Sequence, residues 1–506
     1  MIFCMNQTAM AGRLLVFSLA ITPLSVMAND SILVHKMEYE TGWVHFEKGC
    51  LSNPALTHLL PVNSLSMISI VGISQPSSLP RIPQLGSGGR NFKVNASSFQ
   101  LSGQSNAVWG NASYENGRKY NIVWNETSDF LQVFPYVMAD SRGGDLKYEE
   151  YKLEGGYSAR HRKLHYGINV GYRALQEYRD HDPRPNNNVA DLHAQVGFGY
   201  NAHKDYIFAI AVEAGKYKQT NELAYYNELG AQMEYHLTGI GNDFSRFSGQ
   251  SNNTFFKGYS LGGELNLTNR KCVGWSVSAG YLFTQMEKIL TDLNRLPLNK
   301  LNIDAFRGSV GYNTHSYGIR LCGHYVDRKG NDNLFGDATG SIYPQIGTKR
   351  QYVGRMGEVR TEGFWTIKGF TCFTFNIEPK FAYLSISNRH HSSGNHLKSD
   401  DLQFGVCGKM DYRKKNNVFS ISLEMARRQN LSTDLVLYNS VSTSLSNTLD
   451  NINKYFKDGE TRFSLGLEYT RKVWNNKAVA FGFRWQHACY VTTSDNCYEG
   501  KLAFYL

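Results

Sequence analysis

The stretch Lys163 to Tyr178, KLHYGINVGYRALQEY, alternates between two kinds of side chain. A period of two residues is that of an extended strand whose two faces meet different environments. A strand of a soluble sheet usually has about 5–6 residues, whereas a strand that crosses a bilayer needs about 9–11, with one face in lipid. The stretch therefore favours a membrane-spanning strand. Its apolar positions are Leu164, Tyr166, Ile168, Val170, Tyr172 and Ala174, and His165, Gly167, Asn169, Gly171 and Arg173 stand between them.

The same alternation recurs along the chain, and short connections alternate with long ones. That layout is typical of bacterial outer-membrane barrels. We expect a transmembrane antiparallel up-and-down β-barrel of about 16–18 strands over residues 105–506, with an even strand number and with Glu115 to Arg118 (ENGR) as one hairpin turn. A soluble propeller or solenoid would need shorter strands and a regular repeat, and no fixed repeat is present. Long connections are expected at 179–189, 219–254, 329–351, 388–400 and 431–460.

The two ends of the chain predict export and insertion. Residues 1–28 have the form of a signal peptide, with Arg13, an apolar run over 14–26 and a small-residue cleavage site ending at Ala28. Residues 498–506 alternate once more and resemble the terminal β-signal recognised by the outer-membrane assembly machinery, although Leu506 stands where Phe is commoner. The expected location is therefore the outer membrane of a Gram-negative bacterium.

Residues 29–104 have a different character from the remainder of the chain. They alternate poorly, and five of the 12 prolines lie here, at positions 54, 61, 76, 80 and 83. The segment is interpreted as a periplasmic extension, a plug inside the lumen or a disordered lead-in, with one short helix at 53–60. No run after Ala28 approaches the roughly 18 apolar residues of a transmembrane helix.

Several motifs resemble an uncharacterised family of outer-membrane β-barrels from Bacteroidota. They are KLEGGY at 152–157, YRA at 172–174 and YRDHDPRPN at 178–186. The resemblance covers most of the mature chain and implies an outer-membrane location, but it implies no known chemistry. Barrels of this kind are associated with gene clusters that encode TonB-dependent receptors and surface lipoproteins. The resemblance therefore implies one of these as a partner in nutrient uptake.

The most distinctive connection carries alternating charges and is stiffened by two prolines, at positions 183 and 185. Arg179, Asp180, Asp182 and Arg184 either line a constriction that filters solutes by charge, or cross-link a rigid loop through their own ion pairs. A second connection gathers three imidazoles, at His390, His391 and His396, which are weak candidates for a metal such as Zn²⁺. Because spacing in a loop is unconstrained, a solvated loop remains the alternative. No cofactor is assigned.

Alternation also predicts which polar side chains face the lumen. Both signs of charge are present, which suits a hydrated interior or ion pairs between neighbouring strands. His165, His193, His324 and Ser278 share the lumen face with Glu264, but nothing in the sequence places a serine beside a histidine with an orienting partner, so no enzyme is expected. The charged lumen candidates are Arg173, Glu264, Glu424, Glu468 and Arg484.

The net charge of +10 comes largely from the short turns. Contact with lipid headgroups explains this better than nucleic acid, which an exported barrel does not meet. Seven cysteines follow residue 28, an odd number, and Cys489 and Cys497 flank the last loop on opposite strand faces. The basic turn residues include Arg160, Arg162, Lys163, Arg270, Lys271, Arg413, Lys414 and Lys415.

Three functions are compatible with these features. The leading hypothesis is a non-enzymatic transport component, either a channel or an accessory to a TonB-dependent uptake system. The alternative is a plugged structural barrel that anchors other envelope proteins. An outer-membrane hydrolase is a minor third possibility and would require a Ser–His pair within hydrogen-bond reach.

Overall fold

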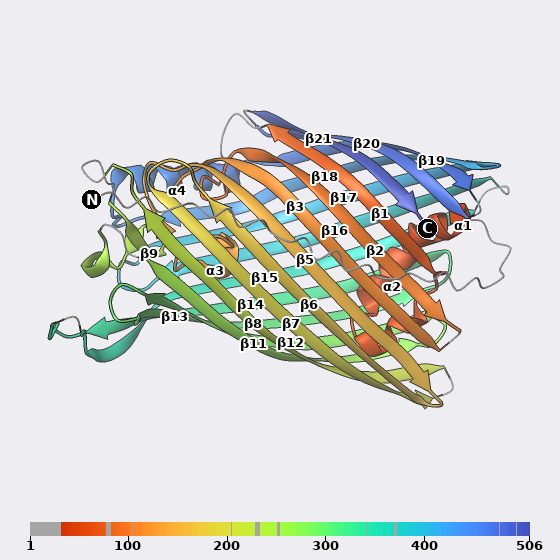
Figure 1. The fold of residues 1–506 in the computed structure, drawn as a ribbon, viewed down its shortest axis with the longest axis horizontal. Helices are drawn as coiled ribbons and strands as arrows, with labels where there is room; N and C mark the ends of the chain where they lie inside the picture. The colour runs from red at the N-terminus through yellow and green to blue at the C-terminus, as the bar shows by residue number, and fades with distance from the viewer. Residues whose placement is uncertain are drawn as a thin grey trace, which may run out of the picture.

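Eighteen strands form one closed antiparallel sheet in the computed structural model (Figure 1). The structure describes residues 32–76, 82–103, 105–203, 205–227, 233–249, 253–340, 342–368, 372–474, 476–491 and 493–506. Each barrel strand pairs with the next along the chain, and β1 closes the barrel by pairing with β21, from Met67 opposite Tyr505 to Ser74 opposite Tyr498. The expected signal peptide lies outside the described residues.

The barrel strands have 12 to 24 residues, longer than a bilayer alone requires. They are β1 (Leu65–Pro76), β2 (Gly88–Ser102), β3 (Asn106–Ile122), β5 (Gly144–His161), β6 (Leu164–Tyr178), β7 (Arg184–His203), β8 (Tyr206–Ala224), β11 (Thr254–Asn269), β12 (Gly274–Leu290), β13 (Leu296–Asn313), β14 (Tyr317–Phe335), β15 (Gln345–Lys368), β16 (Phe373–His390), β17 (His396–Lys414), β18 (Asn417–Val436), β19 (Glu460–Trp474), β20 (Lys477–Cys489) and β21 (Ser494–Tyr505).

Alternation along β6 places its two sets of side chains as expected. Leu164 is 56% exposed on the outer wall, whereas His165 is 1% exposed inside. Phe504 and Leu506 also lie on the outer wall, at 40% and 42% exposed. The fold class is confirmed: the outer wall is apolar and the lumen is polar, as a transmembrane barrel requires. Within the described ranges, no helix has the length and apolarity that a membrane span needs.

Three expectations about the positions of strands, turns and connections were wrong. The barrel begins at Leu65 rather than near 105, because 65–76 and 88–102 form β1 and β2. Their outer faces mix Ser, Gly, Gln and Arg with apolar residues, which hides the alternation. The ENGR motif is not a turn; it lies inside β3, where Asn116 pairs with Phe92 and Glu149. The long connections are also shorter than expected, because strands extend into them; that at 179–189 shrinks to 179–183.

The two ends of the barrel differ, and each holds chain segments inside its mouth (Figure 1). At the turn end, where short turns join the strands, lie α1 (Ile32–Tyr39), α2 (Gly42–Cys50) and the 3₁₀ helix η1 (Pro54–Leu59), together the plug. Residues 53–60 were expected to be helical, and η1 confirms this. Thr41 caps α2 by accepting from Val44 N, and Asn53 caps η1 by accepting from Ala55 N.

At the loop end, three connections fold inward and form what is here called the cap. Its described residues are 123–143, 225–227, 233–249, 253 and 437–459. They contain α3 (Phe130–Val133), β4 (Met138–Ala139), β9 (Tyr235–Gly239), β10 (Asn242–Asp243), η3 (Ser245–Phe247) and α4 (Thr443–Lys457). Trp124, Val137 and Leu445 of the cap pack against lumen-facing Phe256 and Leu301 of the wall, and all five are buried. The largest apolar core therefore sits inside the barrel at its loop end.

Candidate functional site

Charged side chains hold α1 of the plug against the wall. The Nζ atom of Lys36, 1% exposed, lies 2.6 Å from Glu468 of β19 and 3.1 Å from Glu40. Glu40 in turn pairs with Lys409 of β17 at 2.5 Å. Burial alone would raise the pKa of Glu40, but the ammonium groups of Lys36 and Lys409 bring it well below its ordinary range. Opposite charges therefore neutralise one another at this contact, which is the condition for burying them.

The α2 helix is held by a carboxyl group rather than by an ion pair. Glu47, 2% exposed, accepts from Asn313 Nδ2 of β13 at 2.6 Å. Burial raises the pKa of Glu47 to about 7. Beside it, Arg320 of β14 donates to Phe46 O at 3.3 Å and pairs with Glu362 of β15 at 2.6 Å.

A chain of hydrogen bonds fastens η1 to the opposite side of the wall. His58 Nδ1 lies 2.9 Å from Ser158 Oγ of β5, and the rings of His58 and His165 stack with their nitrogens 3.1 Å apart. His165 Nε2 lies 2.9 Å from Asn201 Oδ1. Burial, assisted by the neighbouring imidazole, lowers the pKa of His58 to about 4. The two imidazole rings can stack at this distance because both can remain uncharged.

Between the plug and the wall lies a cavity of about 640 Å³. Gly49 and Ser52 of the plug segment border it, and the remaining lining residues come from β6, β7, β8 and β11 to β15. Its charged and imidazole groups are Glu213, Glu264, Arg307, Arg320, Glu358, Arg360, His193 and His324. No aromatic residue other than these two histidines is in the lining. The cavity therefore suits a hydrated polar solute better than an apolar one.

The charges of this cavity are paired, on one side across strands and on the other along a single strand. Arg307 of β13 lies 2.9 Å from Glu213 of β8 and 2.8 Å from Glu264 of β11. On the other side, Arg360 of β15 lies 3.3 Å from Glu358 and 2.5 Å from Glu362. Both signs face the same space, so the lining favours neither anions nor cations strongly.

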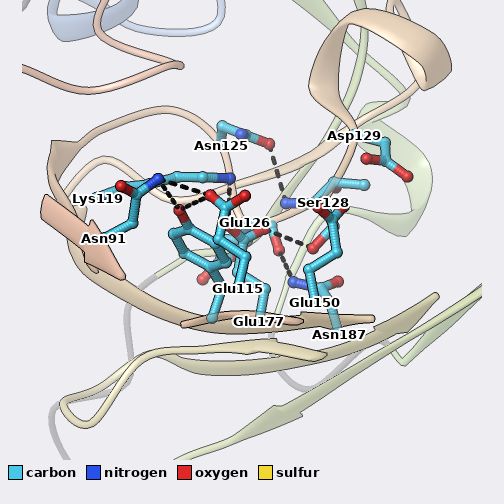
Figure 2. A network of polar contacts seen from close by, with 12 residues as sticks. Asn91, Glu115, Lys119, Asn125, Glu126, Ser128, Asp129, Glu150, Glu177 and Asn187 are labelled. Carbon is cyan, nitrogen blue, oxygen red and sulfur yellow. Dashed lines mark hydrogen bonds and ion pairs between the residues drawn. The ribbon is translucent and has the colours of Figure 1, made fainter. Parts of the chain in front are cut away.

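The cap is joined to the wall by a second polar network (Figure 2). Glu177 of β6, 1% exposed, accepts from Lys119 of β3 at 2.5 Å and from Ser128 of the cap at 2.5 Å. Asn187 and Asn221 of the wall both donate to the backbone carbonyl of Glu126 at 2.8 Å. Wall side chains thus satisfy backbone groups of the cap, which fixes its position in the mouth.

Deeper in the cap, buried carboxyl groups surround one guanidinium. Arg179 lies 2.9 Å from Asp140 and 3.8 Å from Glu126, and all three side chains are fully buried. Burial and the neighbouring Glu234 raise the pKa of Glu126 well above its ordinary range, and burial raises the pKa of Glu234 to about 6. Burial of these two carboxyl groups therefore favours their uncharged forms.

The four charged residues that were expected either to line a constriction or to cross-link a loop lie in the connection at 179–183 and at the start of β7. Arg179 points into the cap, while Asp180 pairs with Lys147 at 2.6 Å and Asp182 pairs with Arg184 at 2.9 Å. Asp182 also accepts from the backbone of Tyr226 and Asn227. Only the Asp182–Arg184 ion pair is internal to this stretch, and none of the four residues is in the lining of the cavity.

The five lumen candidates are separated rather than gathered. Only Glu264 lines the cavity. Arg173 pairs with Asp129 of the cap and with Glu150, and Glu468 pairs with Lys36 of the plug and Lys501. Glu424 and Arg484 lie across the barrel on β18 and β20.

The imidazoles of the second loop are also apart. His390 contacts Ser393 and Thr238, His396 lies near Asp434, and His391 is exposed. In the described part of the chain, no group of three or more His, Cys, Asp or Glu side chains is arranged to hold a metal. Cys489 and Cys497 are not joined to each other by a disulfide.

A Ser–His pair is present, but it is sealed. Ser158 is 0% exposed beneath η1 and does not border the cavity. A substrate has no access to its hydroxyl, and the second nitrogen of His58 faces His165 rather than a carboxylate. The contact therefore serves to attach the plug.

The closed sheet, the apolar outer wall and the plugged polar lumen define an outer-membrane type of β-barrel. Residues 54–504 match the model of a family described as "Family of unknown function (DUF6850)", and the chain belongs to that family. No curated protein matches the chain.

Solved structures with a similar barrel share little sequence with it. The ferric preacinetobactin receptor BauA from Acinetobacter baumannii is 9% identical, with 88% of this chain and 80% of that chain covered and a TM-score of 0.41. The copper transporter OprC is 8% identical, with 88% and 81% covered and a TM-score of 0.39. The monoaromatic hydrocarbon channel CymD is 10% identical, with 90% and 92% covered and a TM-score of 0.32.

Proposed function

We propose that this protein is a non-enzymatic transport component of the outer membrane of a Gram-negative bacterium, with its turn end in the periplasm. The observation that carries the proposal is the polar cavity of about 640 Å³ inside a lumen narrowed by a plug and a cap. The lumen is thus neither filled nor an empty pore. A solute would enter through a movement of the cap and leave through a movement of the plug.

The attachments of the plug support a movable part. They combine ion pairs and single hydrogen bonds, through Lys36, Glu47 and His58, with four small apolar clusters, rather than one large apolar core. Polar contacts can be exchanged for water when the plug leaves, at a smaller cost than exposing an apolar core. A TonB-dependent receptor or a surface lipoprotein, which the resemblance to Bacteroidota barrels suggests, is the proposed partner.

Planar bilayers test the proposal. The complete protein is expected to conduct weakly, and a variant that lacks residues 32–62 is expected to conduct in large, stable steps. If the deletion variant still migrates as a folded, heat-modifiable barrel but does not conduct, the transport proposal is wrong.

The same closed mouths favour a second candidate, a scaffold barrel for other envelope proteins. A mild-detergent pull-down from native membranes separates the two. A scaffold requires a stoichiometric companion, and it predicts that deleting residues 32–62 leaves the companion bound and opens no conductance.

A further inference from the structure

Six basic residues form a cluster on two neighbouring turns at the turn end, here called the turn cluster. Asn417 pairs with both Lys414 and Arg471, so the β17–β18 and β19–β20 turns lie side by side. No ion pair joins any member of the turn cluster to another described residue. Unpaired cations at this density require an anion from outside the chain. The members are Arg413, Lys414, Lys415, Arg471, Lys472 and Lys477.

Aromatic rings on the outer wall place the turn cluster at the membrane surface. Tyr412, Phe419 and Tyr469 form a row across β17, β18 and β19, with ring centroids 6.5 and 5.1 Å apart. Phe373 of β16 continues it at 4.6 Å from Tyr412. Such a belt marks the boundary between hydrocarbon and headgroups. The cluster begins one or two residues beyond the belt, at the depth of lipid phosphates.

The same strands carry an apolar groove on their outer wall. The groove measures about 580 Å³ and is lined from β16 to β20 by residues that include Phe375, Val406, Leu423, Phe463 and Trp485. Gly408 lies within it, and a Cβ placed there would meet only the ring of Phe375, at 4.0 Å. The missing side chain deepens the groove.

The groove lies within reach of a lipid whose headgroup sits on the turn cluster. Gly408 precedes Lys414 by six residues, which is roughly 20 Å along a strand. A strand tilt of about 40° makes this a depth of about 15 Å, half of the ~30 Å hydrocarbon core. An acyl chain of one leaflet therefore ends where the groove is.

We propose that the outer wall over β16 to β20 binds a phospholipid with an anionic headgroup. Its phosphate contacts the turn cluster, and one acyl chain fills the groove at Gly408. Guanidinium and ammonium groups are the usual protein partners of phosphate. An acidic protein partner is disfavoured because the groove faces hydrocarbon. The site depends on lipid contact of the wall and is independent of the transport proposal.

Native mass spectrometry of the detergent-purified protein tests the site, with phosphatidylglycerol and phosphatidylcholine of identical chains as probes. The complete protein is expected to retain one phosphatidylglycerol at least tenfold more tightly than phosphatidylcholine. Substitution of Lys414, Lys415 and Arg471 by Gln is expected to remove that preference. Gly408→Leu is expected to weaken retention of both lipids equally, because it fills the groove without changing charge.

A matched control comes from another basic turn, between β5 and β6, whose strands do not line this groove. The variant with Arg160, Arg162 and Lys163 all changed to Gln loses the same charge and is expected to retain the lipid like the unchanged protein. Equal loss in this control would overturn the proposal in favour of unspecific attraction. So would competition by free glycerol phosphate as strong as that by phosphatidylglycerol, or loss of a co-purifying acidic protein instead of lipid from the turn-cluster variant.

Discussion

Arg307 reaches Glu264 by crossing an intervening strand at a glycine. The two side chains lie 2.8 Å apart on β13 and β11, and Gly280 of β12 lies between them, opposite both residues. A Cβ at position 280 would lie 2.8 Å from Arg307 Nε, closer than van der Waals contact permits. The glycine thus allows a strand-skipping ion pair at the centre of the cavity.

We expect Gly280→Ala to displace Arg307 and lower the free energy of unfolding by about 2 kcal/mol, the range of an overpacked interior. Urea unfolding in detergent measures the change. Gly323→Ala, on neighbouring β14, is the matched control, because a Cβ there meets no atom within 4 Å. If both variants unfold at the same urea concentration as the unchanged protein, Arg307 is not fixed by Gly280.

Lys36→Gln is expected to loosen the plug. The substitution leaves Glu40 and Glu468 without their shared cation at a site where Lys36 is 1% exposed. Because Glu40 and Glu468 keep Lys409 and Lys501 as cations, the cost is expected to be about 1–3 kcal/mol, below that of an uncompensated buried charge. Faster proteolysis within residues 32–62 of the folded barrel is the expected result.

Lys48→Gln is the matched control, because it removes the same charge from an exposed side chain of α2. The ammonium group of Lys48 lies over the ring of Tyr39. The substitution should leave the cleavage rate of the plug unchanged. Equal rates in the two variants would contradict a role for Lys36 in holding the plug.

The sequence alone predicts the strands of the barrel wall, but it does not predict the segments and contacts inside the barrel. Residues such as Leu164 and His165 reveal their faces through alternation, because lipid and lumen impose opposite chemistry on neighbouring positions. The predicted strand number was right, but the ENGR motif was wrongly predicted to be a hairpin turn. Asn-Gly is the strongest local hairpin signal, and only pairing with β2 and β5 shows that the motif lies within a strand.

The partners of inward side chains depend on contacts far apart in sequence. Lys36 and Glu468 are more than 400 residues apart, and no local sequence pattern predicts their ion pair. Arg307 was missed as a cavity residue because its pairing requires the register of Gly280 on the next strand. The loop motif drew attention to Arg179, but its side chain is fully buried by the cap. The cap sequence has no hydrophobic periodicity from which this burial could be predicted.

Two groups of the plug are expected to give its docking opposite pH dependences. Glu47 has a pKa of about 7 when docked against an ordinary 4.5, so docking loses up to about 3 kcal/mol as pH rises from 4.5 through 7. His58 has a pKa of about 4 against 6.5, so docking loses a similar amount as pH falls from 6.5 through 4. In the unchanged protein these losses partly offset one another.

Substitution separates the two groups. Glu47→Gln is expected to leave docking that weakens with falling pH, and His58→Asn to leave docking that weakens with rising pH. Protection of the plug from protease between pH 4.5 and 7 measures both slopes. Slopes of the same sign in the two variants would show that other groups control the plug.

Arg179 and Arg184 bracket the same short connection but are expected to differ greatly in their contribution to stability. Arg179→Gln leaves Asp140 fully buried without its cation, which costs about 3–5 kcal/mol. Arg184→Gln breaks a pair whose arginine is 36% exposed, which costs less than about 1 kcal/mol. Thermal unfolding followed by loss of heat-modifiable migration ranks the two variants. Equal unfolding midpoints for the two variants would mean that water reaches the interior of the cap, and that Arg179 is solvated rather than buried beside Asp140.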